Sequence, residues 1–203
     1  MDIGVLGTGR MGLGLGRVWA AAGHAVVLGG RDPHALRVRL QGEPAGLVAG
    51  DHAAAAARPV VVLATPYRAT ADLVRSHAAA LAGKVVIDLT NPFGAAPPGA
   101  SGLDVHREAL GAIAHWAVAF KTNFAATIGA ADGVARQCLI AADVAPAREA
   151  ATELARAAGF EVVDCGGLAS AAVLDGMVPL MIDLDRRLGG GAGRSHWRFA
   201  AGG

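Results

Sequence analysis

Residues 2–21 read DIGVLGTGRMGLGLGRVWAA, and this stretch decides the fold class. The apolar run 2–6 has the length of a buried strand and ends abruptly in glycines, after which apolar residues recur at helical spacing. When the pattern Gly-x-Gly-x-x-Gly follows a strand and opens a helix, it is a dinucleotide-binding fingerprint. We therefore expect the pyrophosphate of a dinucleotide at the N-terminus of this helix. The residues expected to hold it are Gly7, Thr8, Gly9, Arg10, Met11 and Gly12.

The end of the next predicted strand, 25–28, indicates which dinucleotide is bound. An NAD site usually carries an acidic residue there, whereas an NADP site supplies a cation for the 2′-phosphate. Here the strand runs into Gly30 and Arg31, which offer room and a permanently charged guanidinium. We expect a preference for NADP(H). The alternative is that Arg31 pairs with Asp32 or caps the following helix.

Strands and helices continue to alternate along the rest of the chain. Strands are expected at 47–49, 59–64, 84–89, 113–120, 136–142 and 161–165. Helices are expected at 33–40, after residue 51, and at 68–81, 103–110, 146–158 and 168–188. Nearly continuous apolar strands separated by helices indicate a parallel sheet covered on both faces. The predicted fold is therefore α/β, a doubly wound parallel sheet, with a Pro- and Gly-rich loop at 90–102.

Two further strand ends are candidate walls of a nicotinamide site. Ala64, Thr65, Pro66 and Tyr67 follow one strand, and Asn91 and Pro92 follow the next along the chain. In a doubly wound sheet these carboxyl ends meet at the edge where ligands bind. We expect Asn91 to bind the carboxamide and Pro66 to present a rigid face. Ordinary strand-end turns are the alternative.

Composition excludes several classes of function. The 18 basic residues are nearly balanced by 17 acidic ones, which argues against a nucleic-acid partner. No stretch reaches the roughly 18 uninterrupted apolar residues of a membrane span, and the first residues resemble no signal peptide. We expect a cytoplasmic protein without a membrane partner. The seven histidines never stand at metal-ligand spacing, so no metal is expected, and the contexts of Cys138 and Cys165 are those of buried thiols.

Several longer motifs follow one another between residues 3 and 199. They are GTGRMGLGLG, GGRDP, VVVLATPY, VIDLTNP, VAFKTNFAA, GFEVVDCGGLASAAVLDGMVPLMIDL and WRF. In this order the chain resembles the F₄₂₀-dependent NADP oxidoreductases. The resemblance implies a Rossmann-type NADP-binding domain at 1–120, a small C-terminal α/β domain at 121–203, and a homodimer. It also implies hydride exchange between NADP(H) and the deazaflavin coenzyme F₄₂₀.

Carried over by position, the resemblance implies roles for individual residues. The pyrophosphate contacts fall on residues 8–11 and the 2′-phosphate contacts on residues 30 and 31. The nicotinamide and deazaflavin surroundings fall near Pro66, Tyr67, Asn91 and the segment 119–122, which begins with Ala119. The archaeal members read GGTGNLG, where this chain has one glycine fewer and Arg10 for Asn. Lys121 stands where those members carry His and many bacterial relatives carry Asn.

The change at Lys121 keeps other second substrates open. Hydride exchange between two stacked cofactor rings requires no side-chain acid or base. An alternative is an NADPH-dependent reductase of an imine, carbonyl or quinone, in which Lys121 or Tyr67 supplies a proton or orients the acceptor. Lys121 could also be an exposed charge at a strand end. A third hypothesis is a non-catalytic NADP(H) sensor.

The helix expected at 168–188 carries more apolar residues than one packed face requires. We predict that it builds a homodimer. Internal packing alone is the alternative.

Overall fold

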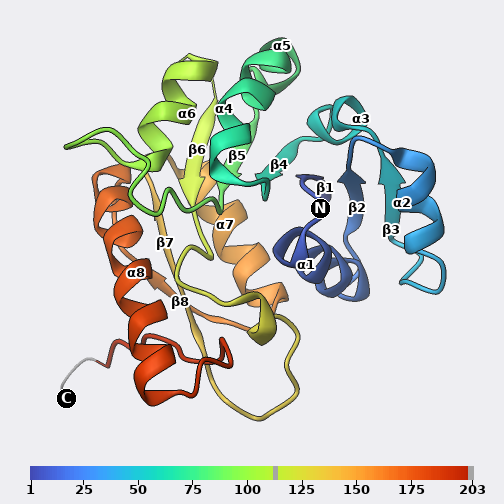
Figure 1. Ribbon diagram of the computed structural model, residues 1–203. Helices are drawn as coiled ribbons and strands as arrows, with labels where there is room; N and C mark the ends of the chain where they lie inside the picture. The colour runs from blue at the N-terminus through green and yellow to red at the C-terminus, as the bar shows by residue number, and fades with distance from the viewer. Residues whose placement is uncertain (112–113, 201–203) are drawn as a thin grey trace.

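The computed structural model describes residues 1–111 and 114–200, and its strands form one sheet in the order β3-β2-β1-β4-β5-β6-β7-β8 (Figure 1). The strands are β1 Asp2–Leu6, β2 Ala25–Gly29, β3 Leu47–Gly50, β4 Val60–Leu63, β5 Val85–Asp88, β6 His115–Val118, β7 Gln137–Ala142 and β8 Glu161–Asp164. Neighbours pair in parallel except β6 and β7, which are antiparallel. The predicted doubly wound parallel sheet is confirmed apart from the antiparallel pair of β6 and β7, and the strand order reverses beside β1.

Helices cover both faces of the sheet. They are α1 Arg10–Ala21, α2 Pro33–Arg39, α3 His52–Ala56, α4 Tyr67–Ser76, α5 Ala78–Leu81, α6 Gly102–Leu110, α7 Ala145–Ala157 and α8 Ala171–Leu188. Alternate residues of each buried strand face opposite ways, so Val62 packs in the core with α1 and α7, whereas Val61 packs with α3 to α6 and α8. None of the described helices is long and apolar enough to cross a membrane.

The glycine turn brings α1 unusually close to β1. A Cβ atom at Gly12 would lie 2.2 Å from the carbonyl oxygen of Gly7, and one at Gly7 would lie 2.4 Å from that of Ala64. Gly7 also has a φ of 128°, a conformation that side chains disfavour. These contacts involve backbone on both sides, which cannot swing away as a side chain could. The turn therefore tolerates only glycine at positions 7 and 12.

The sheet runs without interruption past residue 120, where the sequence predicts a domain boundary. β6 pairs with β7 across this point, and the indole N–H of Trp19 in α1 donates to the carbonyl of Leu154 in α7 at 2.9 Å. The rings of Trp19 and Phe120 also pack edge to face, with centroids 6.0 Å apart. The division into 1–120 and 121–203 stays a prediction.

Several predicted elements end a few residues away from their observed bounds, and two differ more clearly. The helix expected at 68–81 is broken at His77, whose backbone leaves helical geometry and whose ring nitrogen Nδ1, in place of its backbone N–H, bonds the carbonyl of Leu73 at 2.9 Å. The strand expected at 113–120 is shorter, because Phe120 adopts a φ of 56° that ends extended structure. Ile113 lies outside the described residues.

We predict that alanine destabilises the protein at one glycine of the turn and not at another. Gly12→Ala forces a Cβ atom onto the backbone and should lower the free energy of unfolding by about 1–3 kcal/mol. A Cβ atom at Gly9 meets no described atom within 4 Å, so Gly9→Ala should change stability by no more than about 0.5 kcal/mol. Urea unfolding of both variants measures the difference, and equal losses would contradict the packing described here.

Candidate functional site

The first turn of α1 presents unpaired backbone donors. Gly9 is the N-cap residue, and no side chain caps the helix there. The first N–H groups of a helix have no partner within the helix, and with the helix dipole they attract an anion. Because a Cβ atom at Gly9 would project into open space, a phosphate could approach this backbone closely. The turn thus has the geometry of a phosphate cradle.

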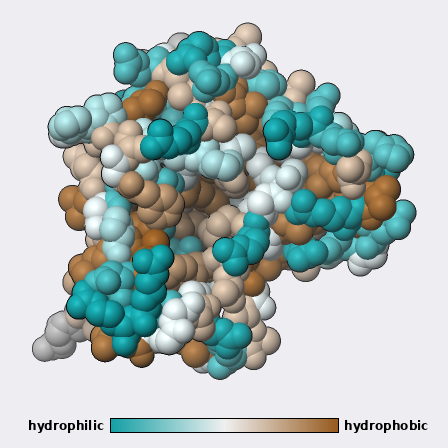
Figure 2. Space-filling view, in the orientation of Figure 1, coloured by the Kyte–Doolittle hydropathy of each residue, from teal (hydrophilic) through white to brown (hydrophobic). Residues whose placement is uncertain are grey.

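A cavity of about 950 Å³ opens in front of this turn, and Figure 2 shows the hollow near the middle of the visible face. Twelve of the residues singled out from the sequence line it. They are Gly7, Thr8, Gly9, Arg10, Met11, Gly30, Arg31, Ala64, Thr65, Pro66, Asn91 and Lys121. The structure therefore brings together segments from the ends of β1, β2, β4, β5 and β6.

Arg31 stands at one end of the cavity with its guanidinium uncommitted. Asp32 does not pair with it, because the Asp32 carboxylate caps α2 by accepting from the N–H of Ala35 at 2.9 Å. Arg31 takes part in no ion pair among the residues that the structure describes. A Cβ atom at Gly30 would lie 2.9 Å from the methyl carbon of Thr8, so a side chain there would crowd the cradle. This end can receive a phosphate.

Asn91 and Thr65 lie farther along the cavity and are held differently. The Asn91 amide nitrogen donates to the carbonyl of Lys121 at 2.9 Å, and its amide oxygen has no partner within the described part of the chain. That oxygen can accept a hydrogen bond from a carboxamide. The Thr65 hydroxyl instead shares a hydrogen bond of 2.8 Å with Thr70 at the start of α4.

Four residues expected at the site lie outside the cavity wall. Gly12 packs beneath the turn, while Pro92 and Ala119 are buried. Tyr67 turns its ring toward His106, with centroids 5.1 Å apart. Burial, and then the charges of Asp175 and Asp88, raise the pKa of Tyr67, so its phenol stays protonated at neutral pH.

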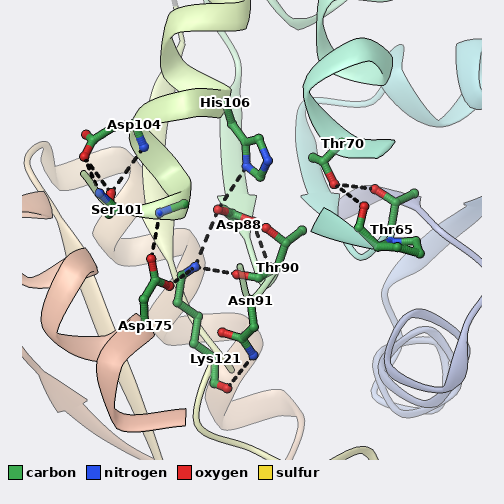
Figure 3. A network of polar contacts seen from close by, with 12 residues as sticks. Thr65, Thr70, Asp88, Thr90, Asn91, Ser101, Asp104, His106, Lys121 and Asp175 are labelled. Carbon is green, nitrogen blue, oxygen red and sulfur yellow. Dashed lines mark hydrogen bonds and ion pairs between the residues drawn. The ribbon is translucent and has the colours of Figure 1, made fainter. Parts of the chain in front are cut away.

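Lys121 belongs to a buried cluster of charges rather than to the surface, so its interpretation as an exposed strand-end charge is wrong. Its side chain is 1% exposed, and its ammonium donates to the carbonyl of Thr90 at 2.5 Å and to the carboxylate of Asp175 at 2.7 Å. The Asp88 carboxylate lies 3.7 Å away (Figure 3). No sequence pattern pointed to Asp175, which lies 54 residues away on α8.

Asp88 is ionised within this cluster. Burial alone would raise its pKa, but the Lys121 ammonium, a hydrogen bond from His106 and the N–H of Thr90 together lower it to about 2. The His106 ring nitrogen Nδ1 lies 3.3 Å from Asp88, and both side chains are fully buried. A carboxylate and an ammonium are thereby held beneath the floor of the cavity.

The far end of the cavity is apolar and was missed by sequence reasoning. It is lined by Phe93, Phe124, Ala125, Val178, Met181 and Ile182, and His52, Ala69 and Leu73 add to the wall elsewhere. Val178, Met181 and Ile182 lie on α8, where helical spacing predicted only a packed or dimerising face. A planar ring could lie against these side chains.

The other chemical groups do not form a second centre. In the described ranges, no three His, Cys, Asp or Glu side chains gather where they could hold a metal ion. Cys138 is fully buried in β7, and burial raises the pKa of its thiol to about 12. Cys165 is half-buried, and burial raises its pKa as well. Neither thiol is activated.

Comparison with known proteins identifies the relationship. A family model described as NADP oxidoreductase, coenzyme F₄₂₀-dependent, matches residues 2–92. The chain is 31% identical over 212 residues to the F₄₂₀-dependent NADP reductase of Methanothermobacter thermautotrophicus, an alignment covering 92% of this chain and 90% of the relative.

Solved structures agree with this relationship. A protein from Arthrobacter sp. FB24, assigned as an F₄₂₀-dependent NADP reductase, superposes with a TM-score of 0.85 at 26% identity, covering 99% of this chain and 100% of the other. An imine reductase from Streptomyces aurantiacus superposes with a TM-score of 0.65 at 18% identity, and the match covers 91% of this chain and 61% of the reductase. This likeness shows the fold alone. The chain belongs to the family of coenzyme F₄₂₀-dependent NADP oxidoreductases.

Proposed function

We propose that the protein is an oxidoreductase that transfers hydride between NADP(H) and coenzyme F₄₂₀. The observation that carries this proposal is the continuity of one cavity from the phosphate cradle and Arg31 to an apolar end. The nucleotide and a second ring system would share that space. The curated relatives, named F₄₂₀-dependent NADP reductases, support the choice of second substrate.

The residues at the cradle fit a 2′-phosphorylated dinucleotide. The backbone N–H groups of residues 9–11 would hold the pyrophosphate, and Arg31 would hold the 2′-phosphate beside Gly30. The free amide oxygen of Asn91 would accept from the nicotinamide carboxamide, and Pro66 would border the ring. Tyr67, Pro92 and Ala119 would act only by packing behind this wall.

The bound cofactors supply the chemistry, in which hydride leaves C4 of the nicotinamide for C5 of the deazaflavin. The chain would contribute orientation and a water-poor slot, formed by the aromatic and α8 side chains of the apolar end. Because the Lys121 ammonium donates to Thr90 and Asp175, we assign Lys121 to holding these segments together rather than to proton transfer. This arrangement suits an exchange that needs no side-chain acid.

We expect purified protein to bleach the visible absorbance of F₄₂₀ when NADPH is added. Two other outcomes would favour one of the alternative functions. NADPH oxidation with an imine, carbonyl or quinone but not with F₄₂₀ would contradict the proposal in favour of another reductase. NADPH binding without turnover of any acceptor would instead indicate a sensor.

Arg31→Ala should raise the Kd for NADPH by roughly tenfold or more, because it removes a charge-assisted contact to the 2′-phosphate. The Kd for NADH, which lacks that phosphate, should not change. Arg37→Ala is a matched control, since Arg37 is an exposed arginine on α2 that does not line the cavity. Fluorescence titration of the reduced nicotinamide measures each Kd. A loss of NADPH affinity equal in both variants would refute the assignment of Arg31.

We also propose a homodimer built on α8. Val173 is 65% exposed, Leu180 50% and Leu188 83%; Val173 and Leu180 are seven residues apart and lie on the same side of the helix, away from its buried face. Burial of such exposed apolar side chains under a second copy stabilises the dimer.

The cytoplasmic location stays a prediction.

Leu180→Glu should convert the dimer to a monomer at micromolar concentration, because it places a charge in the apolar stripe. Ala172→Glu, at an exposed position of the same helix outside the stripe, should leave the dimer intact. Light scattering coupled to size-exclusion chromatography distinguishes the two states. A monomeric wild type would exclude this interface.

A further inference from the structure

Phe93 lines the cavity and is nevertheless largely exposed. Its exposed fraction is 63%, whereas Phe120 in the core is 1% exposed. Phe93 follows closely after Asn91, the residue proposed to bind the nicotinamide carboxamide. Most of this phenylalanine is therefore covered by no other part of the described chain, although it stands on the wall of the candidate site.

The backbone at Phe93 has a conformation that phenylalanine disfavours. The N–H of Ala95 donates to the carbonyl of Pro92 at 2.9 Å and closes a tight turn. The two central residues of this turn, Phe93 and Gly94, have φ angles of 48° and 83°. A turn with two positive φ angles is typically built from glycine, asparagine or aspartate, because a larger side chain crowds its own backbone there. The chain thus keeps a phenylalanine where a smaller residue would be more stable.

The turn is anchored next to the cavity. Pro92 is buried, and a Cβ atom at Gly102, where the loop returns to the fold, would lie 3.2 Å from the ring of Pro92. The N–H of Gly102 donates to the carboxylate of Asp175 on α8 at 2.7 Å. Both ends of the loop are therefore tied to packed structure. Phe93 directly follows one of these fixed points, so its backbone is held at the cavity rather than at the tip of the loop.

Packing within the chain does not explain a phenylalanine at this position, because most of the residue is exposed. Residues that are kept in a disfavoured backbone conformation cluster at sites that bind or react. Phe124 and Met181 line the same cavity, so its wall carries a second aromatic ring and a polarisable thioether. A ligand in the cavity would bury the Phe93 ring, and an aromatic face gains most from contact with another planar ring.

We propose that Phe93 stacks on the acceptor of the hydride and thereby selects a planar conjugated ring over a small imine or carbonyl. The inference rests on the proposed function, in which coenzyme F₄₂₀ is the acceptor and the nicotinamide lies at Asn91 and Pro66. That placement leaves the aromatic part of the wall to the second ring. Two stacked rings bury apolar surface and attract each other through their π-systems. A small imine or carbonyl would leave most of the Phe93 ring in water.

The test uses a substitution that should stabilise the protein and weaken acceptor binding at the same time. Asparagine accepts a positive φ, so Phe93→Asn should raise the melting temperature of the full chain by about 2–4 °C. The same variant should raise the Kd of F₄₂₀ by about tenfold, because it removes the stacked ring. Phe93→Tyr keeps a ring and should bind F₄₂₀ as tightly as the wild type. Phe199→Asn is a matched control, since Phe199 is 66% exposed and does not line the cavity, and it should leave this Kd unchanged.

Fluorescence titration of oxidised F₄₂₀ in the presence of NADP⁺ measures the first Kd, because no hydride can move between two oxidised cofactors. A separate titration with NADPH alone should give the same Kd for every variant. The inference would be overturned if Phe93→Asn left the Kd of F₄₂₀ unchanged, weakened NADPH equally, or lowered the melting temperature. A wild type that bound NADPH but not F₄₂₀ would instead refute the proposed function, and the inference with it.

Discussion

The close contact between the start of α1 and the end of β1 is the constraint on which the site depends. The backbone atoms of Gly7 and Gly12 approach each other without an intervening side chain, and Gly7 also adjoins the backbone of Ala64. This contact aims the unpaired N–H groups of α1 at the space above the sheet. It also brings the ends of β1 and β4 together, so that the cradle and the adjoining wall are built by the same packing.

The second half of the site is held by ions rather than by close backbone packing. Lys121 links the ends of β5 and β6 to α8 through Asp175, and Asp175 in turn holds the beginning of α6. Buried ion pairs often contribute little net stability, because the desolvation of each charge offsets their attraction. Their geometry is nevertheless specific, and here it holds the helix that carries Val178, Met181 and Ile182 to the cavity.

Local sequence patterns predicted the features that depend only on residues close together in the chain. The glycine turn, the strand ending at Arg31 and the loop after Asn91 each follow from the residues within a few positions. Helix breaks that depend on a side chain were harder to predict from the sequence. At His77 the ring nitrogen, in place of the backbone N–H, bonds the carbonyl of Leu73. The antiparallel pairing of β6 and β7 carried no local signal, because an apolar strand reads the same in either direction.

The sequence by itself determined the alternation of strands and helices, the phosphate cradle and the cation beside it, since each is encoded in a continuous segment of the chain. Only the tertiary structure decided that Lys121 is buried, that Tyr67 faces His106, and that α8 lines the cavity. These facts depend on partners 39 to 54 residues apart in the chain, such as the pair of Lys121 and Asp175. Because a charged or aromatic residue has the same local pattern whether it meets solvent or a distant partner, only the folded chain distinguishes the two.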